Sequence, residues 1–224
     1  EKDTLIWYTS DNGGLSTDPN ACGYLRGHKG SVFEGGIRVP CIVEWPGRIK
    51  PMITDLPAST MDIMPTIVDL LDLPEDSIMS VRDGESILSL FDGRTPIRNR
   101  PIPFIFLRNM ALIDGKYKLL STSRTRNDSW QLYDLSRDLG ETKDVSAGFP
   151  GRFEKMKAQA QALLRSIEAS AEGRDYPEGR VLQPQRSAFW RDMEEYKPHF
   201  KTFVRLKPGF VVPVKRNTQR KGRN

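Results

Sequence analysis

Two short apolar runs near the start of the chain frame a loop that is rich in glycine and charge. Residues 4–10 read Thr-Leu-Ile-Trp-Tyr-Thr-Ser, and residues 39–45 form the second run. A continuous apolar run is typical of a strand that is buried on both faces, as in the middle of a parallel sheet. The first run stops at Asp-Asn-Gly-Gly (11–14) and the second at Pro-Gly (46–47). The pattern therefore predicts two strands of an α/β sheet.

The next predicted element is a helix that ends near residue 73. Thr60 and Asp62 offer N-caps, Pro65 suits the first turn, and Pro74 stops the helix. Its apolar positions leave only a narrow polar edge, so we expect the helix to be largely buried. Residues 74–100 are irregular and polar, which predicts a surface crossing between two subdomains.

Four short strand-like runs then predict a small antiparallel sheet. They lie at residues 102–107, 111–113, 117–120 and 130–133. The pair Asp114-Gly115 between two of them is typical of a hairpin turn, because both residues tolerate a positive φ. Apolar residues at helical spacing from 153 to 171, followed by Gly173, predict one amphipathic helix across a face of this sheet.

Composition narrows the class of protein. The chain has 224 residues, 38% hydrophobic and 28% charged, which is typical of a globular protein. No apolar run approaches the roughly 20 residues of a membrane span, so we expect none. From residue 174 onward periodicity is lost, which predicts an extended or disordered tail with aromatic anchors such as Phe189 and Trp190. Residues 196–224 hold nine Lys or Arg and no Asp or Glu, which exceeds the net charge of +5 of the whole chain.

Asp11 and Asn12 are the first candidates for chemistry. They follow the carboxyl end of a predicted strand, where ligands bind in open α/β sheets. A carboxylate and an amide oxygen suit Ca²⁺ or Mg²⁺, although Asp-Asn-Gly is also a common wording for a plain turn. Lys29 lies before Gly30 and can reach an anion, while the ordinary reading is a solvated loop lysine. A phosphate-binding P-loop is excluded, because it requires Gly directly before the lysine and Ser or Thr directly after it.

The wording around these residues resembles the sulfatases of the alkaline-phosphatase-like fold. Ser-Asp-Asn-Gly-Gly (10–14) is followed by Leu-Arg-Gly-His-Lys-Gly (25–30), Glu-Gly-Gly-Ile-Arg-Val-Pro (34–40) and Trp-Pro-Gly (45–47). Each piece alone is a weak signal, whereas four pieces in this order are specific. Residues 62–66, 115–119 and 132–135 also resemble this family, and the resemblance covers roughly residues 4–170. It departs from the family at Asp-Leu-Gly-Glu (138–141), where Asp-Pro-x-Glu is usual, and we expect a loosened turn there.

The resemblance implies a role for each candidate residue. Asp11 and Asn12 match the family's ligands for a divalent ion, Ca²⁺ with Mg²⁺ as the alternative. Lys29 matches the lysine that contacts sulfate, and His28 is a substrate-binding candidate at the rim. Arg26, Glu34 and Arg38 also match the pattern, and we interpret them as a frame of ion pairs and hydrogen bonds that fixes the loop.

The sequence contains no convincing catalytic nucleophile, so we assign no catalytic residue. Sulfatases of this type convert a Cys or Ser in Cys/Ser-x-Pro/Ala-x-Arg to formylglycine. Cys-Gly-Tyr-Leu-Arg (22–26) has the cysteine and the arginine but lacks the small residue or proline at its third position, and it follows the metal motif instead of preceding it. We therefore expect the formylglycine and the remaining metal ligands in a missing N-terminal part of the same enzyme, and this chain alone to be inactive.

These inferences give the following expectations for the whole chain. Residues 1–100 form the end of the α/β catalytic domain with a mixed or parallel sheet, 101–173 a small α+β subdomain, and 174–224 a basic tail. The enzyme hydrolyses a sulfate ester, with sulfated polysaccharides among the candidate substrates. The resemblance implies a periplasmic, extracellular or lysosomal location, and we expect no nucleic-acid partner.

Two alternative functions remain open at this stage. A phosphoesterase of the same superfamily shares the fold and the metal-centred chemistry, although the wording of the Lys29 loop favours sulfate. A non-catalytic polyanion-binding fragment is the second alternative, because the basic tail attracts any polyanion.

Overall fold

The computed structural model describes residues 2–18, 20–122, 129–175 and 193–206. The chain divides into two compact units, residues 1–175 and residues 176–224, and each is described by itself. Among the described residues, none of the helices combines the length and the apolar character that a membrane crossing requires.

The two strands predicted at the start of the chain are present, but they pair antiparallel. Strand β1 (Ile6–Thr9) pairs with β2 (Cys41–Glu44), with Ile6 opposite Glu44 and Tyr8 opposite Ile42. One face of this pair is open, since Ile6 is 52% exposed and Tyr8 is 61% exposed. The expectations of a parallel pairing and of burial on both faces are therefore wrong for the described residues, because only one face of the pair has a packing partner within them.

The other face of β1 and β2 packs on the segment that we expected to cross the surface. Ile87, Leu90 and Phe91 are buried there, partly within the 3-10 helix η3 (Leu88–Asp92), and Trp7 and Val43 pack against them. A shorter 3-10 helix, η2 (Glu75–Ser77), precedes it. The prediction of a surface segment at residues 74–100 is thus wrong around these three residues, whose side chains pack against the strands, while most of the segment is irregular and exposed as predicted.

The predicted helix is present in two parts. The 3-10 helix η1 (Thr60–Asp62) leads into α2 (Ile63–Leu70). Ser59 is the N-cap of η1 and forms a reciprocal capping box with Asp62. Of the two predicted N-caps, Asp62 precedes α2 as its N-cap residue, without a side-chain capping bond there, whereas Thr60 lies within η1. The helix is less buried than expected, because the Met64 side chain is 57% exposed.

All four strands of the predicted antiparallel sheet are confirmed, in the order β3-β4-β5-β6. They are β3 (Ile102–Phe106), β4 (Asn109–Asp114), β5 (Tyr117–Thr122) and β6 (Trp130–Asp134). The predicted hairpin is also confirmed, but its turn lies one residue later than predicted: Asp114 pairs with Tyr117 at the end of β4, and Gly115, with φ of +59°, begins the turn. Helix α3 (Pro150–Ala171) is the predicted amphipathic helix, and Gly173 follows its end with φ of +79°.

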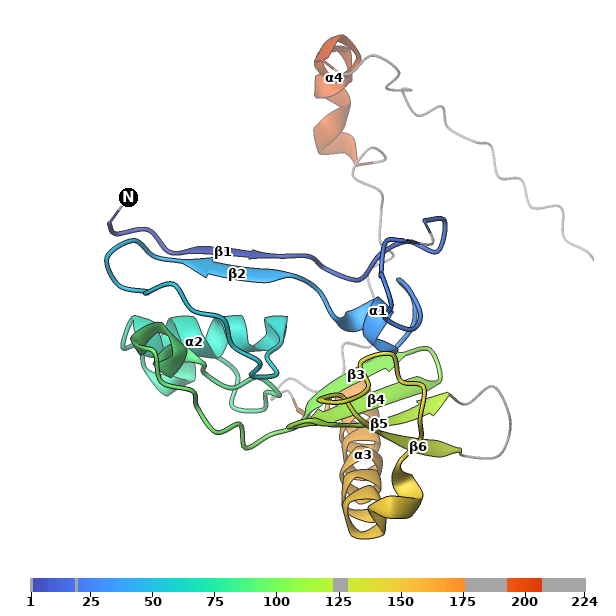
Figure 1. Ribbon diagram of the computed structural model, residues 1–224. Coiled ribbons are helices and arrows are strands. Elements are labelled where there is room, and N and C mark those ends of the chain that lie inside the picture. The colour runs from blue at the N-terminus through green and yellow to red at the C-terminus, as the bar shows by residue number, and fades with distance from the viewer. Residues whose placement is uncertain (1, 19, 123–128, 176–192, 207–224) are drawn as a thin grey trace, which may run out of the picture. The chain divides into compact units, whose positions relative to one another are not determined.

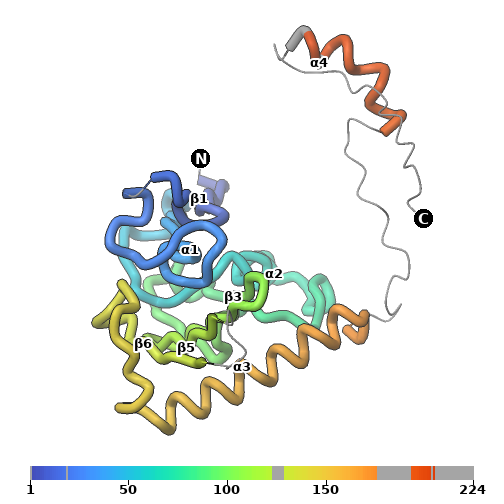
Figure 2. The backbone as a smooth tube through the Cα atoms, turned by 90° about the vertical axis from the view of Figure 1, so that its right-hand side faces the viewer, coloured from blue at the N-terminus to red at the C-terminus, as the bar shows by residue number. Residues whose placement is uncertain are grey.

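Apolar side chains cover both faces of this sheet. Leu112, Leu119 and Leu132 face α3 and pack on Met156 and Ala160. The opposite face carries Ala111, Leu120 and Tyr133, which pack on Val32 and Phe33 from the glycine-rich loop. Figures 1 and 2 both place the short helix α1 (Glu34–Ile37) and α3 on opposite sides of the sheet. The loop that carries the candidate site therefore rests on the sheet.

The second unit contains helical structure where we predicted an extended tail. The 3-10 helix η6 (Glu194–His199) continues directly into α4 (Phe200–Leu206), so the prediction is wrong for these residues. The expected anchors Phe189 and Trp190, and the basic residues from 207 onward, lie outside the described residues.

Candidate active site

The turn after β1 presents the two candidate metal ligands. The Ser10 hydroxyl donates a 2.9 Å hydrogen bond to the Asn12 carbonyl oxygen and so fixes the turn. The Asp11 residue is exposed and Asn12 is half-buried. Within the described residues, no hydrogen bond or ion pair engages the Asp11 carboxylate or the Asn12 side-chain amide. Their oxygens are therefore available to an ion.

Two backbone hydrogen bonds join this turn to the loop that carries Lys29. The Lys29 amide N–H donates to the Gly14 carbonyl oxygen over 2.8 Å. The Gly13 amide N–H donates to the Gly36 carbonyl oxygen in α1 over 2.9 Å. The two motifs, which are separate in the sequence, thus lie side by side.

Glycines make this close approach possible. A Cβ atom at Gly13 would lie 1.8 Å from the Gly35 carbonyl oxygen, and one at Gly36 would lie 2.3 Å from the Ser31 carbonyl oxygen. Any side chain at these positions would push the backbone segments apart. Close backbone packing therefore explains the glycines of the Glu-Gly-Gly motif.

The side chains of Lys29 and His28 differ in their surroundings, although both residues are exposed. The Lys29 ammonium has no partner among the described residues and is free to meet an anion. The His28 Nδ1 lies 2.8 Å from the Lys29 carbonyl oxygen and donates to it when the proton is on that nitrogen. This contact holds the His28 ring against its own loop.

The three charged residues that we interpreted as a frame do hold the loop. The Arg26 guanidinium lies 4.0 Å from the centre of the Phe33 ring and donates to the Glu141 carbonyl oxygen over 3.1 Å. Glu34 Oε2 lies 3.5 Å from Arg38 Nη1. These contacts tie the loop to the sheet and to the residues that follow β6.

Two further members of the frame were not predicted. Lys118 and Glu141 are buried together with Glu34, and their side chains are within ion-pair distance. Burial raises the pKa of the Glu141 carboxyl, and the charge of Lys118 opposes this rise. The sequence did hold one signal, since Lys118 interrupts an apolar strand run. Glu141 has a φ of +53° and ends the departure at 138–141, so that turn reaches the loop through the Glu34 amide.

Cys22 forms no disulfide, and its thiol makes a hydrogen bond within the same region. Its Sγ donates to the Gly35 carbonyl oxygen over 3.1 Å, and Cys41 is also free. Cys22 thus contributes one more contact between the loop and α1.

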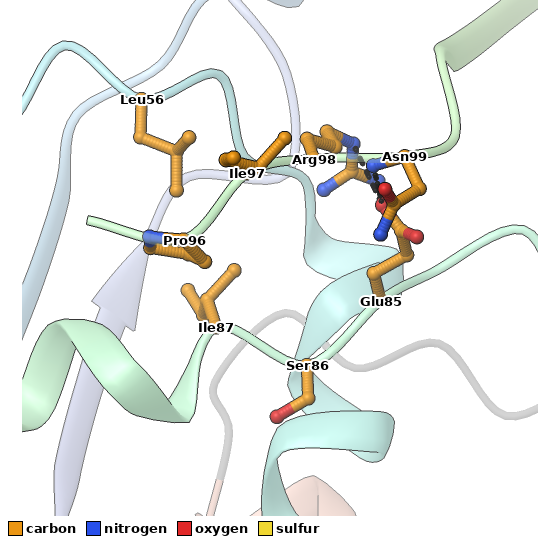
Figure 3. A pocket seen from close by; sticks show the side chains of 8 residues that line it. All are labelled: Leu56, Glu85, Ser86, Ile87, Pro96, Ile97, Arg98 and Asn99. Carbon is orange, nitrogen blue, oxygen red and sulfur yellow. Dashed lines mark hydrogen bonds and ion pairs between the residues drawn. The ribbon is translucent and has the colours of Figure 1, made fainter. Parts of the chain in front are cut away.

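A hollow beside α2 lies apart from these residues. A cavity of about 230 Å³ is lined by Leu56, Glu85, Ser86, Ile87, Pro96, Ile97, Arg98 and Asn99 (Figure 3). Its charged groups are already paired, because Arg98 makes two hydrogen bonds of 2.7 and 3.0 Å to Asp62. We therefore interpret this cavity as part of the packing between α2 and its neighbours.

The turn supplies only part of a metal site. Ca²⁺ takes six to eight oxygen ligands, whereas Asp11 and Asn12 bring at most three side-chain oxygens. In the part of the chain that the structure describes, no group of three or more His, Cys, Asp or Glu side chains could hold an ion. The donor types of Asp11 and Asn12 fit a hard cation.

Comparison with known proteins gives the same family at the level of sequence and structure. A family model described as Sulfatase matches residues 1–73. A sulfatase of Formosa agariphila is 33% identical over 172 residues, which cover 67% of this chain and 30% of that protein. Human arylsulfatase A is 31% identical over 197 residues, which cover 76% of this chain and 39% of that protein.

A solved structure has the same arrangement of elements. It comes from work on the metabolism of multiple glycosaminoglycans by Bacteroides thetaiotaomicron, with a TM-score of 0.61 and 26% identity. The match covers 75% of this chain and 39% of that structure. The chain thus spans between 30% and 39% of the length of these relatives. With these matches and the motifs of the loop, the chain belongs to the sulfatase family.

Proposed function

We propose that this chain is part of a sulfuric ester hydrolase and supplies Asp11, Asn12 and Lys29 to its active site. The observation that carries the proposal is the hydrogen bond between the Lys29 amide and the Gly14 carbonyl oxygen. It holds the backbone of the Lys29 loop against the turn that carries Asp11 and Asn12, and the side chains of all three residues have no partner among the described residues. An anionic ester that binds a cation at the turn would then also meet the lysine.

Each residue has a separate part in the proposed reaction. Asp11 and Asn12 would hold Ca²⁺, or Mg²⁺, which when bound polarises an oxygen of the sulfate group. Lys29 would donate to a sulfate oxygen and offset the negative charge that gathers there in the transition state. His28, held by its own loop, would border the part of the substrate that carries the ester. The formylglycine nucleophile would come from the N-terminal part of the same enzyme.

The open face of β1 and β2 supports such an N-terminal part. Ile6, Tyr8 and Ile42 are each more than half exposed and lie on the same face of the two strands. Burying three large apolar side chains would contribute several kcal/mol, at about 1.5–3 kcal/mol for each. We propose that the remaining part of the enzyme packs on this face and completes both the metal shell and the nucleophile.

The substrate class follows from the chemistry of the site and from the relatives. A lysine and a cation together suit a sulfate ester, and the solved structure named above belongs to work on glycosaminoglycans. We propose a sulfated polysaccharide as the substrate and a periplasmic, extracellular or lysosomal location, where such polymers occur. The polyanion-binding alternative rests mostly on basic residues from 207 onward, outside the described ranges, and stays a prediction.

Calcium titration of the whole 224-residue chain tests the half site. Calorimetry should detect weak Ca²⁺ binding that is lost in Asp11→Ala and in Asn12→Ala. Asp18→Ala is the matched control, because Asp18 is exposed in the same region and caps the Asn20 amide. The chain alone should not hydrolyse an aryl sulfate. Equal binding in all four proteins, or robust turnover by the chain alone, would contradict the proposal.

The phosphoesterase alternative requires a second comparison. The reading frame immediately upstream in the genome should encode Cys/Ser-x-Pro/Ala-x-Arg, and joining it to this chain gives a completed enzyme. Hydrolysis of matched aryl sulfate and aryl phosphate by that enzyme then decides between the two activities. Faster hydrolysis of the phosphate would favour the alternative.

A further inference from the structure

A buried lysine joins the antiparallel sheet to the candidate site. Lys118 extends from β5, and its Nζ lies 2.9 Å from Glu34 Oε1 and 2.8 Å from Glu141 Oε1. The contact with Glu34 is an aligned hydrogen bond, whereas the contact with Glu141 is an ion pair without that alignment. The three residues are exposed by no more than 2%. Glu141 Oε2 in addition accepts the backbone N–H of Glu34 over 2.7 Å.

Stability alone does not account for this arrangement. Two carboxylates and one ammonium leave a net negative charge out of water, and only the half-exposed Arg38 adds a further positive charge to Glu34. Replacing buried ion pairs by apolar residues is often neutral or stabilising, because desolvation offsets the attraction between the charges. What such a cluster does provide is a fixed position for each of its members.

The member whose position matters here is Glu34, the first residue of α1. The next two residues of α1 bond directly to the candidate site. The Gly35 N–H donates to the Arg26 carbonyl oxygen over 2.7 Å, and the Gly36 carbonyl oxygen accepts the Gly13 N–H. The backbone segments are in close contact at Gly13, Gly35 and Gly36. A shift of Glu34 would therefore move both the Lys29 loop and the turn that carries Asp11.

We infer that Lys118 is a positioning residue, which sets the relative placement of Lys29 and Asp11 through Glu34 and Glu141. This inference rests on the proposed function for its catalytic consequence, but its geometric content is independent of turnover. Lys118 contacts neither substrate nor metal in this account. It acts only by fixing α1 on the sheet.

Amide hydrogen exchange, resolved by residue in the whole chain, tests the positioning directly. Lys118→Met leaves Glu34 and Glu141 facing each other without their cation, so exchange at the Gly13 and Lys29 amides should become about 100-fold faster. The amides of β4 should change much less, because their bonds lie within the sheet. Lys116→Met is the matched control, since Lys116 lies two residues earlier on the hairpin and pairs with Asp134 at a half-exposed position.

The result is judged by the ratio of exchange at Lys29 to exchange in β4. A ratio that rises in Lys118→Met and stays constant in Lys116→Met supports the positioning role. A constant ratio in both variants overturns it, because Lys118 then acts only on global stability. If Lys118→Met fails to fold, Glu141→Gln is judged by the same ratio, since glutamine keeps an oxygen for the Glu34 N–H but loses the charge that faces Lys118.

Turnover provides the second readout and separates the two proposals. In the completed enzyme, Lys118→Met should lower kcat/KM for an aryl sulfate by about 100-fold, because misplaced groups lose catalytic alignment. Lys116→Met should leave kcat/KM unchanged. Selective exchange without a loss of kcat/KM would overturn the catalytic consequence of the positioning, while an enzyme without any sulfatase activity would overturn the proposed function and leave the exchange result standing.

Discussion

The Lys29 amide N–H donates a 2.8 Å hydrogen bond to the carbonyl oxygen of Gly14. This contact joins two motifs whose proposed chemistry differs, since we propose that the turn binds a cation and that the loop binds an anion. The backbone, and not the side chains, makes the connection, so both functional groups stay free for other partners. The account of this chain as part of a sulfatase site depends on that arrangement.

Adding one methyl group at Gly13 should open the connection. Gly13→Ala places a Cβ against the Gly35 carbonyl oxygen, so the turn has to move away from α1. Thermal or denaturant unfolding should show a loss of about 1–3 kcal/mol, the usual cost of overpacking. Calcium binding to the chain should also weaken, because Asp11 moves with the turn.

The matched control for that variant is Gly151→Ala. Gly151 lies in the first turn of α3 and has open space around the position of a Cβ. Alanine is the better helix former, so the free energy of unfolding should rise by up to about 1 kcal/mol. If Gly13→Ala is as stable as Gly151→Ala, the close packing of the turn on α1 is wrong.

The ion pair beside the cavity in Figure 3 should matter for stability and not for calcium. Arg98→Met leaves the fully buried Asp62 carboxylate without its cation, which should cost about 3–5 kcal/mol. Arg94→Met removes an exposed pair with Asp92 and should cost less than about 1 kcal/mol. Denaturant unfolding of both variants measures the difference. Equal costs, or a loss of calcium binding in Arg98→Met, would contradict this reading of the cavity.

Acid should remove one specific contribution to stability. The Ser136 hydroxyl hydrogen bond and the Lys116 ammonium hold the pKa of the Asp134 carboxyl below its ordinary value. A lowered folded-state pKa stabilises the fold above the unfolded pKa of about 4, and this contribution is lost as the pH falls through the folded-state pKa. The difference in unfolding free energy between the natural chain and Asp134→Asn should therefore shrink from about pH 5 downward. A difference that grows on acidification would reverse the sign and refute the assignment.

The elements with regularly spaced apolar residues and standard turn residues could be predicted from the sequence. The hairpin at Asp114-Gly115 and helix α3 have periodic apolar residues and standard turn residues, and both are confirmed. The segment 74–100 has no period, so Ile87, Leu90 and Phe91 did not stand out as a core. The helical turns after residue 193 contain Pro198, which obscured them in the sequence.

The sequence suggested the candidate site residues, but it did not suggest the buried cluster that holds their loop on the sheet. Asp11, Asn12 and Lys29 came from motif wording, and the structure shows how they lie without testing their roles. The cluster around Lys118 was missed because its members are far apart in the sequence: Glu34 is 84 residues from Lys118. No periodicity connects such positions, and only the fold brings them together. The antiparallel pairing of β1 was missed because an apolar run alone does not show which strand lies beside it.

Calcium dependence in the completed enzyme tests the central claim most directly. Lys29→Ala should lower kcat/KM for an aryl sulfate by about 10²–10³-fold, the usual loss for a preorganised donor, with an unchanged Tm. Lys50→Ala, at another exposed loop lysine, should leave kcat/KM unchanged. Asp11→Ala should also lower activity, but excess calcium should restore part of it, because the lost ligand weakens ion binding.

The account predicts that excess calcium rescues Asp11→Ala and not Lys29→Ala. A common response of the two variants to calcium, or near-full activity of Lys29→Ala, would contradict the separate roles of the cation-binding turn and the anion-binding lysine.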